Sequence, residues 1–179
     1  STSDAHLGIQ AAVSDVLPHA SWQRCRTHFA KNLSSMVPKT QWPTLSAMFH
    51  TIFQQPDAEA VWTQAREVVE FCQAKFPHVA DYLEEHLDDV LAFTHTPKSV
   101  WTKVWSNNPT ERLNRKIRRR TDVVGIFPHR DAVIRLVGAV LAEQHDEWIQ
   151  QKRYMSLTSL EQTKALITAN VLDTDTTTP

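Results

Sequence analysis

The sequence is poor in the residues that build tight turns and covalent cross-links, with only 3 glycines and 2 cysteines among 179 residues. Scarce glycine argues against a sheet-rich, turn-rich fold and favours long helices. Two cysteines do not suggest a disulfide framework, so we expect a reducing cytoplasm. No apolar run approaches the roughly 18 residues that a membrane-spanning helix needs. The N-terminal residues also lack the basic-then-apolar order of a signal peptide, and we expect no membrane partner.

The charge is small in total but unevenly distributed. The formal net charge is −1, which alone does not indicate a polyanionic partner. Residues 1–90 hold 6 basic and 11 acidic side chains, whereas residues 91–179 hold 13 basic and 9 acidic ones. A local basic surface matters more than the total, because electrostatic fields decay over roughly 8–10 Å at ordinary salt.

Helical periodicity dominates the middle and the later part of the chain. From about residue 44 to residue 93 the apolar residues recur at helical spacing, with Asp57 as a helix cap and Pro77 as a helix start. A long helix is predicted from about Arg130 to Gln151. Residues 173–179 are polar and rich in threonine, which predicts a disordered tail.

The most informative segment is a strongly basic helix that begins near Glu111. Six of the ten residues from Glu111 to Arg120 are Lys or Arg. These six are Arg112, Arg115, Lys116, Arg118, Arg119 and Arg120. So many cations with few intervening acids favour contact with phosphates over a merely solvated surface, although the second interpretation stays open.

Glu111 itself has two interpretations. As the third residue of a helix capped by Asn108, with Pro109 first, it would reach back to the cap amide. Alternatively it shares a helix face with Arg115 and Arg118, where a carboxylate holds a divalent metal and guanidinium groups hold phosphate. That combination indicates chemistry on nucleic acid.

Near the N-terminus, Asp4 and a Cys-x-x-His pair are further candidates. Ser3 or Asp4 is a possible cap for the helix that follows, and residues 22–25 are predicted to form a short strand. Cys25 and His28 make up half of a zinc site, which Cys72 and His78 complete only at a non-standard spacing. A buried thiol beside a hydrogen-bonded histidine explains the pair adequately without a metal.

Three tryptophans are candidates for stacking on a DNA base at a cleavage site: Trp62, Trp101 and Trp105. Trp62 lies at helical spacing among apolar residues, which favours a place in the core. Trp101 and Trp105 come shortly before the basic helix and are the better candidates.

Three segments resemble the Mutator-type transposases of bacterial insertion sequences. Residues 107–128 read NNPTERLNRKIRRRTDVVGIFP and resemble the C-terminal signature of that family. Upstream, residues 3–8 read SDAHLG and residues 21–32 read SWQRCRTHFAKN, which are similar to two further blocks of the family in the same order. The resemblance extends over most of residues 1–150.

The resemblance implies a mainly α chain that forms the C-terminal part of a ribonuclease-H-like α/β catalytic domain with an all-helical insertion. Residues 1–36 and 101–155 would belong to the ribonuclease-H-like core, residues 37–100 to the insertion, and residues 156–179 to a C-terminal helix and tail. Of the family's three metal-binding acids, the second maps onto Asp4 and the third onto Glu111. The first is expected upstream of Ser1, so the chain resembles a fragment that is inactive alone.

The chemistry implied by the resemblance is phosphoryl transfer on DNA, at transposon ends and in target DNA. Two Mg²⁺ or Mn²⁺ ions would be held by the acids, while the six cations of residues 112–120 bind backbone phosphates. Cys25 and His28 would position residues near the catalytic core. The family also implies a homo-oligomer in the nucleoid region of a bacterial cytoplasm.

Two alternatives come from other functional classes. A non-catalytic helical module would bind DNA through residues 111–120 without any metal. A zinc-stabilised interaction domain would instead hold one zinc ion per chain.

Overall fold

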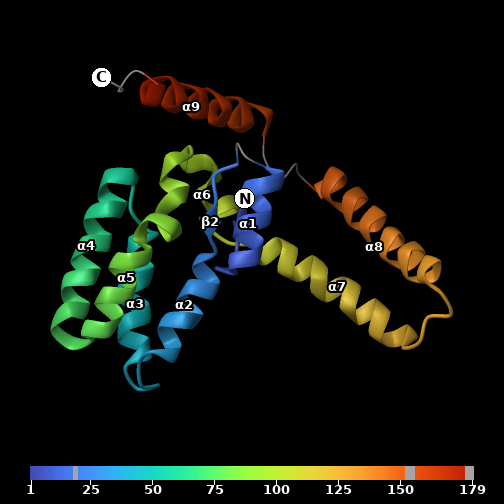
Figure 1. The fold of residues 1–179 in the computed structure, drawn as a ribbon, viewed down its shortest axis with the longest axis horizontal. Helices are drawn as coiled ribbons and strands as arrows, with labels where there is room; N and C mark the ends of the chain where they lie inside the picture. The colour runs from blue at the N-terminus through green and yellow to red at the C-terminus, as the bar shows by residue number, and fades with distance from the viewer. Residues whose placement is uncertain (18–19, 152–155, 176–179) are drawn as a thin grey trace. The chain divides into compact units, whose positions relative to one another are not determined.

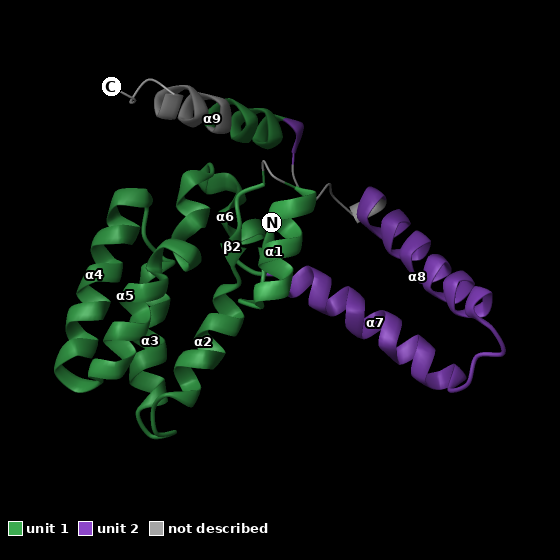
Figure 2. Cartoon of the chain, in the orientation of Figure 1, with its two compact units in different colours: residues 1–106, 158–179 green, residues 107–157 purple. Residues whose placement is uncertain are grey.

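The computed structural model describes residues 1–17, 20–151 and 156–175, which fall into two compact units (Figure 2). Unit 1 comprises residues 1–106 and 158–179, and unit 2 comprises residues 107–157. Most of the described residues are helical, so the prediction of a mainly α chain is confirmed. The proposed divisions at residues 36 and 100 stay predictions.

Unit 1 begins with a small parallel sheet. Strand β1 (Thr2–Ser3) pairs with β2 (Gln23–Arg24), with Thr2 opposite Gln23 and Ser3 opposite Arg24. Helix α1 (Leu7–Val16) lies between the two strands in sequence, as a parallel connection requires. The strand predicted within residues 22–25 is confirmed. Because the described chain holds no further strand, a ribonuclease-H-like sheet stays a prediction.

Four helices build the body of unit 1: α2 (Arg26–Ser35), α3 (Trp42–Ile52), α4 (Ala58–Lys75) and α5 (Pro77–Leu91) (Figure 1). Their apolar stripes meet in one core, where several large side chains are fully buried. These include Phe29, Leu33, Leu45, Phe49, Val61, Val68 and Leu83. Asp57 caps α4 as predicted, since its Oδ1 accepts a hydrogen bond from the Ala60 amide at 2.9 Å.

A short irregular segment follows α5 in unit 1. It consists of the 3₁₀ turns η1 (Ala92–His95) and η2 (Lys98–Val100), followed by α6 (Trp101–Val104). The Thr2 hydroxyl donates to the Val104 carbonyl, and the Arg26 amide donates to the Trp105 carbonyl at 2.9 Å. These two bonds tie the segment to β1 and to the start of α2.

Unit 2 is a helical hairpin made of α7 (Asn108–Val124) and α8 (Arg130–Gln151). Gly125 ends α7 with φ of 72°, a conformation that glycine adopts without strain, and its amide donates to the Thr121 carbonyl at 3.1 Å. The predicted helix from Arg130 to Gln151 is confirmed with the same bounds.

The last described element is α9 (Leu157–Asp175). The prediction of a disordered tail from residue 173 is therefore wrong for residues 173–175, which belong to this helix, and residues 176–179 lie outside the described residues.

Candidate metal and nucleic-acid site

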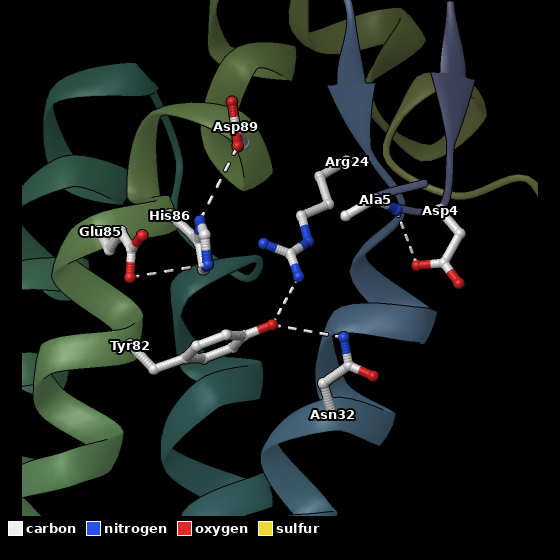
Figure 3. Close-up of polar contacts among 8 residues, drawn as sticks. All are labelled: Asp4, Ala5, Arg24, Asn32, Tyr82, Glu85, His86 and Asp89. Carbon is white, nitrogen blue, oxygen red and sulfur yellow. Dashed lines mark hydrogen bonds and ion pairs between the residues drawn. The ribbon is translucent and has the colours of Figure 1, made fainter. Parts of the chain in front are cut away.

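Asp4 follows directly after β1, at the carboxyl edge of the parallel sheet. The neighbouring strand ends at the same edge, because the Cys25 amide donates to the Ser3 carbonyl at 2.8 Å. The Asp4 side chain is exposed, and its Oδ1 accepts a hydrogen bond from the Ala5 amide at 2.8 Å (Figure 3). Side chains at the carboxyl ends of parallel strands commonly bind ligands.

The predicted capping role of Ser3 or Asp4 is wrong. Ser3 belongs to β1, and the Asp4 carbonyl accepts from the His6 amide at 2.8 Å, so the chain turns before it becomes helical. His6 is the N-cap of α1, and its Nδ1 accepts from the Gly8 amide at 3.2 Å. The Asp4 carboxylate therefore does not cap α1.

Beside this edge, Arg24 is a buried cation that the sequence did not identify. It is only 4% exposed, and its Nη2 donates to the Tyr82 hydroxyl on α5 (Figure 3). The Asn32 side-chain amide donates to the same hydroxyl at 3.3 Å. The guanidinium carbon also lies 4.8 Å from the centre of the Phe29 ring and 5.4 Å from that of the Tyr82 ring. Aromatic faces thus partly compensate the buried charge.

No carboxylate forms an ion pair with Arg24 within the part of the chain that the structure describes, and its Nε has no hydrogen-bond partner there. Burial of a cation is costly unless its donors have partners. The hydrogen bond to Tyr82 and the aromatic contacts of Arg24 offset part of this cost, and they join β2 to α5.

The Cys-x-x-His pair lies next to this edge. Cys25 is fully buried, with its Sγ 4.0 Å from the Ser106 Oγ. The Nδ1 atom of His28 is buried and has no hydrogen-bond partner among the described residues. The thiol is thus buried as predicted, whereas the hydrogen bond of the histidine and the influence of the pair on the site stay predictions.

The structure does not support a zinc site. Cys72 belongs to the core side of α4, where burial raises the pKa of its thiol to about 11. His78 instead makes a hydrogen bond from its Nε2 to the Met36 carbonyl, at 2.8 Å. Across residues 1–17, 20–151 and 156–175, no group of three or more His, Cys, Asp or Glu side chains is arranged to hold a metal.

Two of the three candidate tryptophans make hydrogen bonds within the protein and pack in or against its core. Trp101 is only 4% exposed, and its Nε1 donates to the Thr96 carbonyl at 2.8 Å, so stacking on a base is excluded for it. Trp62 donates to the Thr94 hydroxyl at 3.3 Å and packs against the core. Trp105 is half-buried, and one face of its ring is covered by Arg26.

In unit 2, Glu111 lies in the first turn of α7 and is exposed. The predicted N-cap at Asn108 is wrong by one residue. The Asn107 carbonyl already accepts from the Glu111 amide at 3.0 Å, which makes Asn107 the cap. The Glu111 Oε1 lies 3.4 Å from the Asn107 side-chain amide, so the carboxylate does face the start of the helix.

The cations of α7 form a basic face, which we define as Arg112, Arg115, Lys116, Arg118, Arg119 and Arg120. All six are exposed except Lys116, which is half-buried. Five of them line a shallow depression of about 410 Å³, and Arg118 lies outside it. Between these cations, the apolar residues Leu113 and Ile117 are half-buried.

Two members of the basic face are paired with α8. The Lys116 Nζ lies 3.4 Å from Glu143 and 3.2 Å from Glu147, and the Arg120 Nη2 lies 3.6 Å from Glu143. These acids partly neutralise Lys116 and Arg120. The other four cations are better placed to meet phosphate.

A sequence model described as "Transposase, Mutator family" matches residues 1–151. The chain belongs to the Mutator family of transposases. It is 55% identical over 168 residues to the transposase of insertion sequence IS1081 from Mycobacterium tuberculosis, covering 94% of this chain and 40% of that protein. The recognised resemblance is therefore confirmed.

More distant relatives of this Mutator-family chain carry the same kind of description. The transposase of ISRM5 from Rhizobium meliloti is 32% identical over 164 residues, covering 92% of this chain and 41% of that protein. The transposase of IS256 in transposon Tn4001 from Staphylococcus aureus is 32% identical over 153 residues, covering 84% and 39% respectively. The chain thus spans about two fifths of these relatives' length.

None of the described helices of this Mutator-family chain is both long and apolar enough to cross a membrane.

Proposed function

We propose that this chain is the part of a DDE-type DNA transposase that carries two of its three metal-binding acids, Asp4 and Glu111. The single observation that supports this most is the family match over residues 1–151, because it covers both acids and the whole basic face. The ribonuclease-H-like architecture of the catalytic domain is part of the same proposal. It is supported by the parallel pairing of β1 and β2 that places Asp4 at a carboxyl edge.

The donor chemistry of the two acids fits a divalent metal. Both carboxylates are exposed, and each lies next to a neighbouring amide, of Ala5 and of Asn107 respectively. Carboxylate oxygens are the ligands that Mg²⁺ and Mn²⁺ prefer. Asp4 and Glu111 would hold these ions together with a third acid, and two bound ions would activate the attacking hydroxyl and stabilise the leaving oxygen.

The basic face would hold the DNA backbone during this chemistry. Guanidinium groups bind phosphate in a bidentate manner, and such contacts position DNA without reading its sequence. Arg112, Arg115, Arg118 and Arg119 would carry most of this contact, with smaller contributions from Lys116 and Arg120. The DNA would comprise transposon ends and target, bound by a homo-oligomer in a bacterial cytoplasm at the nucleoid.

A chimeric enzyme tests the proposal. The matching segment of the Mycobacterium tuberculosis IS1081 transposase is replaced by this chain, and Mg²⁺-dependent cleavage at the ends of that element is measured. We expect an active chimera in which Asp4→Asn and Glu111→Gln each abolish cleavage. Residues 1–179 alone, with two of the three acids, should not cleave.

The matched controls are exposed acids on the helix that follows Asp4 and on the helix that holds Glu111: Asp15→Asn on α1 and Asp122→Asn on α7. Both should leave cleavage unchanged, and circular dichroism should show the same helix content in all four variants. Full activity of Glu111→Gln would favour the alternative, a non-catalytic helical module that binds DNA through the basic face. That alternative also predicts DNA binding that is indifferent to Mg²⁺.

A further inference from the structure

A second concave site lies within unit 1, between α2 and α3. Its volume is about 380 Å³, within the roughly 300–1,000 Å³ typical of ligand pockets. The aromatic residue Phe53 is buried at its floor, whereas Trp42 and Arg26 are half-buried and Lys31 is exposed. We call this site the α2–α3 pocket.

The α2–α3 pocket is cationic. The described residues that line it include Arg26 and Lys31 but no acid. Burial lowers the pKa of Arg26, because the partly desolvated cation lacks full hydration. Among the residues that the structure describes, no carboxylate forms an ion pair with Arg26. A partly buried cation of this kind favours an anionic ligand.

The pocket also offers flat apolar surfaces. The Arg26 guanidinium carbon lies 4.1 Å from the centre of the Trp105 ring and 5.1 Å from that of Phe53, so aromatic contacts hold its orientation. Trp42 packs its inner side against the core and is only partly covered. Aromatic side chains beside cations are the combination that binds single-stranded nucleic acid, through base stacking and phosphate contact.

The pocket begins where the sheet ends. Arg26 is the first residue of α2 and is separated from β2 by one residue, while Asp4 follows β1 directly. The register of the two strands places both at the same carboxyl edge. A ligand bound at Arg26 would therefore lie at the same edge of the sheet as the proposed metal-binding Asp4.

We propose that the α2–α3 pocket binds one unpaired nucleotide of DNA, with its base against Trp42 and its phosphate at Arg26 and Lys31. This inference rests on the proposed function, since it assigns part of the DNA path to this pocket. It adds a role for unit 1 that the basic face of α7 does not supply. The partly covered Trp42 ring offers a surface on which an unpaired base stacks, whereas a phosphate alone would need no aromatic ring.

Fluorescence anisotropy with residues 1–179 tests the inference. The probes are a labelled hairpin duplex with a short single-stranded overhang, the same hairpin with a blunt end, and the overhang hairpin with abasic overhang positions. We expect tighter binding to the overhang than to the blunt end. Trp42→Ala should reduce that preference by roughly fivefold to a hundredfold, as removal of a base-stacking platform does, and abasic positions should reproduce the loss.

Matched variants separate the pocket from general charge and from folding. Lys31→Glu should weaken overhang binding, whereas Lys39→Glu, an exposed lysine that does not line the pocket, should leave the preference unchanged. Trp42→Phe keeps an aromatic face and should retain most of the preference. If Trp42→Ala and Lys31→Glu keep the wild-type preference for the overhang, the inference is overturned.

The same measurements distinguish this inference from the proposed function. Arg119→Gln on the basic face should weaken binding to the blunt hairpin and the overhang hairpin alike. If Arg119→Gln does not weaken binding, the proposed DNA path along α7 is contradicted, but the result for the α2–α3 pocket is unaffected. A basic-face effect without a Trp42 effect would overturn only the pocket.

Discussion

The guanidinium carbon of Arg26 lies 4.1 Å from the centre of the Trp105 indole ring. This contact joins the first residue of α2 to the residue that follows α6. The hydrogen bond from the Arg26 amide to the Trp105 carbonyl joins the same two residues. A cation that is partly desolvated gains about 2 kcal/mol from such a ring. The contact therefore helps to hold the carboxyl edge of the sheet in place.

Replacing Arg26 by Leu should lower the free energy of unfolding by about 1–2 kcal/mol, because the backbone hydrogen bond stays while the cation–π contact is lost. Urea unfolding of residues 1–179 measures the change. Arg66→Leu, an exposed arginine of α4, is the control and should have little effect. Equal stability of Arg26→Leu and Arg66→Leu would show that the ring contact contributes nothing.

Tyr82→Phe should destabilise unit 1 by about 1.5–3 kcal/mol, because the buried Arg24 loses the hydroxyl that accepts its hydrogen bond. Removing only the hydroxyl leaves the ring stacked on Phe29, at a centroid distance of 5.3 Å. Asn32→Ala tests the other donor to the same hydroxyl and should cost less, since its bond is neutral and 3.3 Å long. A negligible effect of Tyr82→Phe would mean that water satisfies Arg24 instead.

The members of the basic face should differ in their contribution to DNA affinity. Arg119→Gln should lower the slope of log K against log salt by about 1, as expected when one phosphate contact is lost. Lys116→Gln should lower it less, because Glu143 and Glu147 already pair with this lysine. Lys75→Gln on α4 is the control. Identical slopes for the Arg119 and Lys75 variants would remove α7 from the DNA path.

Stability should fall in alkaline solution partly because of Cys72. Burial raises its pKa to about 11, so between its ordinary pKa of 9.0 and 11 the unfolded chain loses the thiol proton while the folded chain keeps it. Unfolding is then favoured by at most about 1.4 kcal/mol per pH unit in this range.

The variant Cys72→Val removes the titrating thiol and keeps an apolar side chain of similar size. The free energy of unfolding of the wild type minus that of the variant should be constant below pH 9 and should fall above it. A constant difference up to pH 11 would show that the thiol has an ordinary pKa in the folded state.

Local features of the sequence predicted local structure well. The helix from Arg130 to Gln151 and the Asp57 cap depend on periodicity and on hydrogen bonds within a few residues, which the sequence displays directly. Capping at Asn108 was wrong by one position because two asparagines are adjacent, and only backbone geometry selects Asn107.

Contacts between distant residues escaped prediction. Arg24 and Tyr82 are 58 positions apart, and nothing in the sequence near either residue signals their hydrogen bond. The α2–α3 pocket likewise is lined by residues of two helices and by buried phenylalanines. Residues at such sites look like ordinary surface cations or core aromatics until the chain is folded.

A metal-rescue measurement shows whether Asp4 and Glu111 both bind the divalent ions of the reaction. In the IS1081 chimera, Asp4→Cys and Glu111→Cys each replace a hard oxygen ligand with a thiolate, which binds Mg²⁺ poorly and softer Mn²⁺ better. If both acids bind the ions, neither variant should cleave DNA in Mg²⁺ and both should cleave it in Mn²⁺, with Asp122→Cys active in both. Metal binding by both acids is contradicted if either variant cleaves DNA in Mg²⁺ at the wild-type rate, or if Mn²⁺ restores cleavage in neither variant.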